Sequence, residues 1–448
     1  MHELTKLIRE DMKPALGVTE PGAIAFAAAK ARSCVPGEVE SVAVSMNSGM
    51  YKNAFTCGIP GTDQVGSVYA AALGTVAGDP EKGLECLACV SEEDNAKARE
   101  LIREGKVKTA LDSISSRIFI EAGVTTEAGT AVVTIQDTHT NIVKITVNGK
   151  TVFEKAQEMT GETAGEKAGE ETEVQTDSGA GGEAHAIHRY TLAELVDYIE
   201  DVDAAELDFI REAYEVNLKL FQLGLESPKT TFARHLLKLN GGQVISDNEQ
   251  ATASLLCNGA IEARVIGLDA PAMSITGSGA HGIIATMPLY AAYRVNGYPE
   301  EQLLRATALS YLVCMYIKEY SGRLSAFCGC AIAAGSGMAC GLVWLRGGAV
   351  KEMAHTLNNM ASSITGMICD GGNQGCTMKG IAAVDAAYKS VEFAMNGIYI
   401  ADVHGINGET PEETMRNMGR IASPGMTGTE KTIVEIFDAK QKKRGGHA

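Results

Sequence analysis

The chain has 448 residues, of which 39 are basic and 56 are acidic, so its formal net charge is −17. This acidic balance argues against nucleic-acid binding, because phosphate contacts need a cationic face and lysine and arginine cluster only in the C-terminal tail. A chain of this length exceeds one ordinary hydrophobic core, so we expect at least two domains.

The start of the chain predicts two helices, over residues 3–13 and 20–34, separated by Pro14 and Gly17. We expect residues 1–34 to pack on a helical domain formed later in the chain. This segment is charged and amphipathic and lacks the apolar region of a signal peptide. Because the cysteines number eleven, an odd count, we expect reduced thiols and a cytoplasmic protein.

Residues 35–155 predict an α+β domain with an antiparallel sheet. Apolar and polar side chains alternate over 39–46, which is typical of a half-buried strand. A glycine-rich turn then leads into an alanine-rich helix, and residues 92–114 have a helical pattern. Three strand patterns follow, and the last contains Asn148-Gly149, a strong hairpin signal.

The rest of the chain predicts a linker and a helical domain. Residues 156–189 consist mainly of Gly, Glu, Ala and Thr, so they cannot bury a core and predict a flexible acidic linker. Residues 191–221 repeat apolar side chains at three- and four-residue steps, and the later stretches are rich in Ala, Gly and Met with no strand run of similar length. Residues 190–448 therefore predict an all-α domain rich in Gly and Ala. The uncharged stretch 324–345 is composed of small residues, which favours a buried helix pair over a membrane span. The predicted fold class is therefore α+β.

Two cysteines, Cys369 and Cys376, flank the stretch 370–375, which is too rich in glycine for an unbroken helix. Such a loop can gather thiols and backbone N–H groups around one centre, which suits a soft metal or an iron–sulfur cluster. Upstream, Cys328 and Cys330 lie at a predicted helix start, where a thiolate is favoured. Cys330 with the other two would leave one metal position open for substrate. From the spacing alone, metal binding and buried, unliganded cysteines are about equally good explanations. Among metals, zinc is a weaker candidate than an iron–sulfur cluster.

Two further glycine-rich loops carry polar side chains. Ser278 and Gly279 precede a helix predicted to begin near His281, and its first amides could hold a carboxylate. Taken alone, this stretch is better explained as a tight turn between helices. Residues 47–53 follow a strand and precede a glycine turn; the phosphate-loop pattern is absent, and we prefer a small-substrate loop to a plain turn.

Five motifs resemble those of the L-cysteine desulfidase family, which is related to the iron–sulfur L-serine dehydratases: YKNAFTCGIPGT, GSGAHGI, SGRLSAFCGCAIAAGSG, GMICDGGNQGC and RNMGRIASPGMTGTEKTI. The resemblance covers nearly the whole chain apart from the acidic linker. It implies a [4Fe–4S] lyase of amino-acid catabolism without pyridoxal phosphate. The implied reaction is β-elimination from a small amino acid such as L-cysteine or L-serine, giving a 2-oxo acid and ammonia. The implied cluster ligands are Cys330, Cys369 and Cys376.

One position departs from the family. The desulfidases carry a cysteine directly before Thr-Glu-Pro near the N-terminus, and Val18 occupies that position here, although Glu20 and Pro21 are retained. Valine cannot donate or accept a proton. Another group must therefore act as the base, or the substrate is not cysteine, or the activity has been lost.

The resemblance implies that an open iron binds the substrate through its carboxylate and β leaving group while a base removes the α-proton. Two alternatives stay open: another β-substituted substrate, and a non-catalytic protein that binds a cluster or small molecule. Besides the substrate, the expected partner is a second copy of the chain in a homodimer. The glycine-rich helices are compatible with a homodimer but do not demonstrate one. The candidate bases are His281 and Lys52, with Tyr51 behind them, and the candidate substrate-binding residues are Glu20, Asn53, Ser278 and Gly279.

Overall fold

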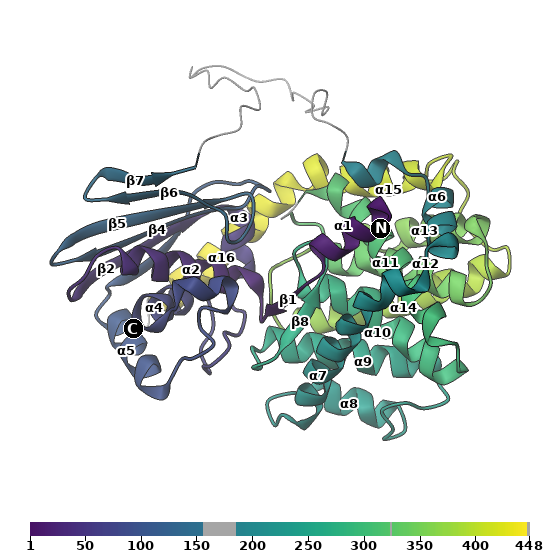
Figure 1. Ribbon diagram of the computed structural model, residues 1–448, viewed down its shortest axis with the longest axis horizontal. Coiled ribbons are helices and arrows are strands. Elements are labelled where there is room, and N and C mark those ends of the chain that lie inside the picture. Colours follow the sequence, from purple (N-terminus) through teal and green to yellow (C-terminus); the bar gives the residue numbers. More distant parts are fainter. Residues whose placement is uncertain (156–184, 323–324, 446–448) are drawn as a thin grey trace, which may run out of the picture.

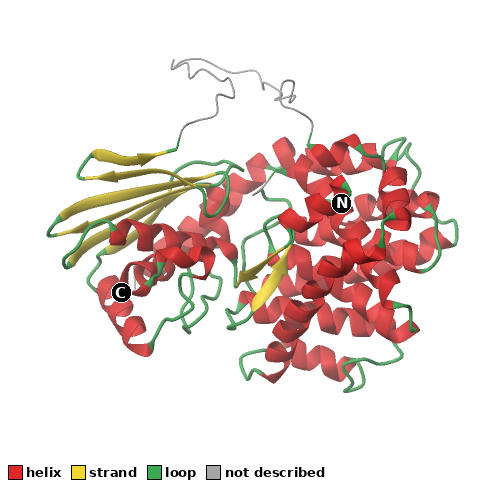
Figure 2. Cartoon of the chain, viewed as in Figure 1, coloured by secondary structure: helices red, strands yellow, loops and turns green. Residues whose placement is uncertain are grey.

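The computed structural model describes residues 1–155, 185–322 and 325–445, so the linker predicted over residues 156–189 lies almost wholly outside the described residues. The described chain forms two halves that lie side by side (Figure 1). Figure 2 shows one half built on a large sheet and the other built almost entirely from helices. The predicted α+β class is confirmed. Among the described helices, none combines the length and apolar character needed to cross a bilayer.

The smaller half contains a six-stranded sheet in the order β3-β2-β4-β5-β6-β7. β2 pairs antiparallel with β4 but parallel with β3, so the sheet is mixed and not purely antiparallel as predicted. The predicted hairpin at Asn148-Gly149 is confirmed, because it joins β6 to β7. The strands are β2 (Val39–Met46), β3 (Val107–Leu111), β4 (Phe119–Thr126), β5 (Gly129–Gln136), β6 (Ile142–Val147) and β7 (Lys150–Glu154).

The predicted helix over residues 92–114 is wrong in its second part. α5 (Glu92–Arg103) stops before Gly105, whose φ of +71° is a left-handed conformation that suits glycine just after a helix. The chain then forms β3, in which Val107 is buried and pairs with Val42. Five residues are too few to separate a strand from the end of a helix by periodicity.

Two helices, α2 (Thr19–Ser33) and α4 (Ser67–Ala77), cover one face of this sheet (Figure 1). They approach closely, since a Cβ on Gly74 would lie 2.2 Å from the carbonyl oxygen of Ala25. We predicted that both N-terminal helices pack on the helical domain. α1 (Glu3–Asp11) does contact α11 there, whereas α2 packs on the sheet because its alanine-rich surface fits against α4.

The larger half is a helical bundle with one short ribbon. β1 (Lys13–Leu16) pairs antiparallel with β8 (Pro271–Ser274), so this half is not purely helical as predicted; four residues carry too little pattern to be recognised. The helices are α6 (Leu192–Asp201), α7 (Arg211–Glu226), α8 (Phe232–Leu239), α9 (Glu249–Val265), α10 (Gly279–Asn296), α11 (Glu300–Ser321), α12 (Gly335–Leu345), α13 (Val350–Ile364), α14 (Gly375–Met395) and α15 (Pro411–Arg420).

The C-terminal helix joins the two halves. α16 (Thr427–Gly445) follows α15 and reaches across to α3 (Ser48–Asn53), at the sheet half (Figure 1). Phe437 of α16 stacks on Phe55, just after α3, with ring centroids 4.5 Å apart. The candidate site lies close to this contact.

Candidate functional site

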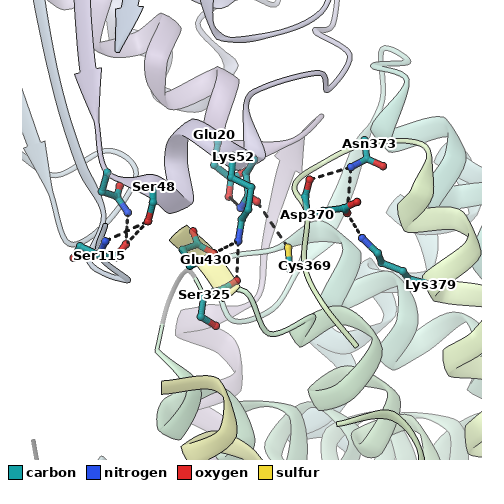
Figure 3. A network of polar contacts seen from close by, with 12 residues as sticks. Glu20, Ser48, Lys52, Ser115, Ser325, Cys369, Asp370, Asn373, Lys379 and Glu430 are labelled. Carbon is teal, nitrogen blue, oxygen red and sulfur yellow. Dashed lines mark hydrogen bonds and ion pairs between the residues drawn. The ribbon is translucent and has the colours of Figure 1, made fainter. Parts of the chain in front are cut away.

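The glycine-rich loop 369–375 lies where the two halves meet (Figure 3). On the helical side, the Cys369 N–H donates to the Ala326 carbonyl oxygen at 2.6 Å, and the Cys328 N–H donates to the Met367 carbonyl oxygen at 3.0 Å. On the sheet side, the Gly372 N–H donates to the carbonyl oxygen of Asn53, the last residue of α3, at 3.3 Å. The loop therefore holds cysteines of the helical half against α3.

Two glycines permit this close approach. Gly371 has a φ of +99°, and a Cβ there would lie 2.3 Å from the carbonyl oxygen of Lys52. A Cβ on Gly372 would lie 2.9 Å from a methyl carbon of Val18, the residue just before α2. The valine that replaces the desulfidase cysteine thus packs directly against the cysteine loop.

We expect Gly371→Ala to lower the free energy of unfolding, by about 1–3 kcal/mol from the left-handed backbone alone. The clash with Lys52 adds to this cost. Gly366→Ala is the matched control, because a Cβ on Gly366 would meet nothing within 4 Å. Urea denaturation measures both variants, and equal stabilities would contradict the close approach.

Three thiols come together at this loop. All eleven cysteines are free. The electrostatic interaction with Cys328 raises the pKa of both Cys369 and Cys376, and the interaction with Cys369 raises the pKa of Cys376. Burial raises the pKa of Cys369 and raises that of Cys376 to about 11, while a sulfur hydrogen bond with Cys330 and burial raise the pKa of Cys328. Two of the three predicted ligands, Cys369 and Cys376, are therefore neighbours.

The third predicted ligand, Cys330, has further neighbours of its own. Cys330 interacts electrostatically with Cys328 and with the fully buried thiols of Cys257 in α9 and Cys314 in α11, and raises the pKa of each. The thiol that acts on both cysteines of the loop is Cys328, which sequence analysis passed over. Cys328 and Cys330 are separated by one glycine, so their spacing in the sequence did not choose between them. The antiparallel bridge between Phe327 and Ile368 brings this segment beside the loop.

A fixed cation stands beside these thiols. Lys379, in the first turns of α14, pairs with Asp370 of the loop (Figure 3). Burial disfavours its charge, but the pair with Asp370 and the neighbouring thiols outweigh burial and raise the pKa of Lys379. Such a cation favours thiolates, and hence a negatively charged thiolate-bound group.

The three thiols of Cys328, Cys369 and Cys376 suit an iron–sulfur cluster better than a single metal ion. In the described parts of the chain, no three His, Cys, Asp or Glu side chains converge as ligands of one metal ion. In a cluster each cysteine binds a different iron, so the sulfurs stand farther apart. Soft thiol donors, a glycine-rich backbone and a neighbouring cation suit such a cluster. Cys328, Cys369 and Cys376, together with Cys330 next to Cys328, are the candidate residues that could hold it.

Lys52 forms a buried ion pair near the thiols. Its Nζ lies 2.7 Å from Oε2 of Glu430 in α16 and donates to the Ser325 carbonyl oxygen at 2.9 Å (Figure 3). The Lys52 side chain is 1% exposed, and Oε1 of Glu430 has no hydrogen-bond partner among the described residues. Glu430 was not predicted as a site residue, because its only signal was its place in a C-terminal motif.

A cavity of about 240 Å³ lies next to this ion pair. Glu430, Ser325 and Ala326 line it from the helical half, and Ser115 lines it from the sheet half. The pockets of drug-sized ligands measure about 300–1,000 Å³, so this one suits a small metabolite. A larger cavity of about 460 Å³ at the end of α13 contains none of the predicted site residues.

The hydroxyl of Tyr51 faces α16. It donates to Asp438 at 2.9 Å, and burial together with Asp438 raises the pKa of the tyrosine. This contact fixes the C-terminal helix on α3 and keeps the phenol protonated. Tyr51 is therefore placed as a support for α16, while its predicted role as a base stays a prediction.

His281 is buried in the first turn of α10. The Thr276 hydroxyl contacts both the Ile275 carbonyl oxygen and Nδ1 of His281. Nε2 of His281 faces Gly329, where a Cβ would lie 2.8 Å away. Burial, aided by nearby cations, lowers the pKa of His281 to about 3, so the ring is neutral at pH 7.

Glu20 and Asn53 connect to the thiols. Asn53 Nδ2 donates to Glu20 Oε1 at 2.8 Å, and its Oδ1 lies 3.9 Å from the sulfur of Cys369. Burial raises the pKa of Glu20, but His139, 3.8 Å away, and Asn53 lower it more, to about 2. Glu20 is therefore a buried carboxylate. Ser278 and Gly279 lie at the start of α10, where the Ser278 side chain forms no cap bond.

Glu20 predicts a pH dependence of stability. Its folded-state pKa of about 2 lies below the ordinary value of 4.5, so its contribution is complete above about pH 5 and is lost as the pH falls toward 2. We expect Glu20→Gln to lower the free energy of unfolding at pH 7 and to flatten its fall between pH 5 and 2. Urea denaturation across this range tests the expectation, and parallel curves for the two proteins would contradict it.

Comparisons with known proteins identify the family of this chain. The model of the serine dehydratase alpha chain matches residues 81–435. A UPF0597 protein of Clostridium botulinum (strain Hall) is 39% identical over 439 residues, covering 98% of this chain and 99% of its own. UPF0597 proteins of Caldanaerobacter subterraneus subsp. tengcongensis and Clostridium tetani are 36% and 33% identical, covering 98% and 97% of this chain and 98% and 97% of their own. The chain belongs to the serine dehydratase alpha chain family, which is associated with iron–sulfur clusters.

Proposed function

We propose that this protein is an iron–sulfur lyase that catalyses β-elimination from a small amino acid such as L-serine or L-cysteine. The products would be a 2-oxo acid and ammonia, formed by desulfuration or dehydration. The observation that carries the proposal is the gathering of three cysteine thiols beside Lys379 and next to the small cavity at Lys52 and Glu430. Family membership supports a dehydratase-like enzyme.

The bound cluster would supply a Lewis-acidic iron position for the β leaving group. The chain's own residues supply the rest. His281 is the proposed base, which is supported by the position of its Nε2 beside the turn between Cys328 and Cys330. Lys52 is held as a cation by Glu430, so it is better suited to balance negative charge than to act as a base.

Val18 bears on the choice of substrate. Its side chain packs against Gly372 of the cysteine loop, where the desulfidases place a thiol. A valine there removes one proton-transfer group and leaves His281 as the base candidate near the cysteines. We therefore propose serine, or another β-substituted amino acid, alongside cysteine as the substrate.

Anaerobic turnover tests the proposal. Protein purified without oxygen and loaded with iron and sulfide should release ammonia and a 2-oxo acid in equal amounts from one or more β-substituted L-amino acids, with D-enantiomers as controls. Air or an iron chelator should remove activity, iron and visible absorption together, because an open iron is exposed. Absence of turnover by cluster-loaded protein would leave the non-catalytic binding alternative.

A further inference from the structure

Arg264 is a buried cation outside the group of residues that sequence analysis selected. It lies in the last turn of α9 and is 4% exposed. Its Nε is buried and has no hydrogen-bond partner among the described residues. By contrast, Arg346 of the same half pairs with Glu249 at 3.0 Å. An unpaired buried charge is costly, so a protein that keeps one has a use for it.

The Arg264 side chain points at the beginning of α10. A Cβ on Gly279, the first residue of that helix, would lie 2.7 Å from Nε and 3.2 Å from Cδ of Arg264. The first N–H groups of a helix have no acceptor within the helix, and the side chain of Ser278 does not cap them. A guanidinium beside a helix N-terminus is a site for an anion, and the fork of arginine matches a carboxylate.

A second buried charge lies within electrostatic range of Arg264. Glu20 is an ionised carboxylate, and Arg264 is among the groups that keep it so. The two do not form an ion pair with each other; the oxygens of Glu20 accept from Asn53 at 2.8 Å and from Thr19 at 3.2 Å, and His139 lies 3.8 Å from Oε1. A buried cation and a buried anion that interact without pairing with each other match the two charges of an amino-acid zwitterion.

We infer that Arg264 and the first turn of α10 bind the α-carboxylate of the substrate and that Glu20 faces its α-ammonium group. The inference rests on the proposed function, since that function makes the substrate an α-amino acid. Asn53 connects Glu20 to Cys369, so a substrate held by its two charges lies with its β-substituent near the thiols. The site selects for a molecule that carries both charges on one carbon.

Binding of L-alanine tests this inference, because L-alanine carries both charges but no leaving group. Titration calorimetry on the full-length, cluster-loaded protein should show that Arg264→Gln weakens binding at least tenfold. Arg264→Lys keeps the charge without the fork and should weaken it less. Arg346→Gln is the matched control and should leave the affinity unchanged. Propionate and ethylamine, which each carry one of the two charges, should bind the wild type more weakly than L-alanine.

Stability without ligand gives an independent readout. If Arg264 is kept for a ligand, Arg264→Met should raise the melting temperature of the ligand-free protein, because it removes an unpaired buried charge. A lower melting temperature, or unchanged L-alanine affinity in Arg264→Gln and Arg264→Lys, would overturn the inference. Failure of the proposed function looks different: Arg264-dependent binding of L-alanine would persist while no β-substituted amino acid is turned over.

Discussion

Cys328→Ser is expected to reduce bound iron to background and to lower lyase activity by at least about 1,000-fold, since the loss of a Lewis-acid contact costs several kcal/mol in the transition state. The reason is geometric. Cys328 acts on both Cys369 and Cys376, and the bridge between Phe327 and Ile368 fixes its backbone beside the loop. Cys369→Ser should behave in the same way.

The variant Cys330→Ser tests which of the two neighbouring cysteines, Cys328 or Cys330, holds the cluster. Because Cys330 also faces the buried thiols of Cys257 and Cys314, we expect this variant to keep its iron and most of its activity. Cys340→Ala, in the buried middle of α12, controls for the loss of a packed thiol. Iron analysis and visible absorption after anaerobic loading provide the measurement. If Cys330→Ser loses the cluster and Cys328→Ser keeps it, the third ligand is Cys330, as the family resemblance implied.

The fold could be predicted from the sequence wherever a local pattern extended over enough residues. β2 shows clear alternation, and Asn148-Gly149 marked the hairpin. The long helices from α9 to α14 were predicted from their small and apolar composition and from the lack of strand patterns between them. β3 and β8 have five and four residues, and both pair with distant partners. Elements this short depend on tertiary pairing, which no local pattern records.

The candidate site was predictable where its chemistry is local. Cys369 and Cys376 share one glycine-rich loop, so the sequence indicated them together. Glu430 and Arg264 matter only because α16 reaches Lys52 and because α9 ends beside α10. Their roles come from contacts between distant segments, and a single glutamate or arginine in a helix gives no signal of its own. The position of Cys328 and Cys330 beside the loop likewise depends on a contact between distant segments, the backbone bridge of Phe327 and Ile368.

Lys52→Met is expected to destabilise the protein by about 3–5 kcal/mol, the usual cost of removing one partner of a buried ion pair. Lys52 is 1% exposed and Glu430 is 6% exposed, and Oε1 of Glu430 already has no hydrogen-bond partner among the described residues. The variant would leave this carboxylate buried without its cation. Lys229→Met is the matched control, because Lys229 pairs with Asp63 at the surface and should change stability by about 0–1 kcal/mol.

The double variant Lys52→Met/Glu430→Gln distinguishes stability from chemistry. Removing both charges should restore most of the lost free energy of unfolding, because no uncompensated charge is left. If Lys52 also serves the reaction through Glu430, which lines the cavity, the double variant should be folded and loaded with iron yet have a much lower kcat. A wild-type kcat in that variant would show that the ion pair has only a structural role, which is to hold α16 against α3. Full additivity of the two single effects on stability would contradict the ion pair itself.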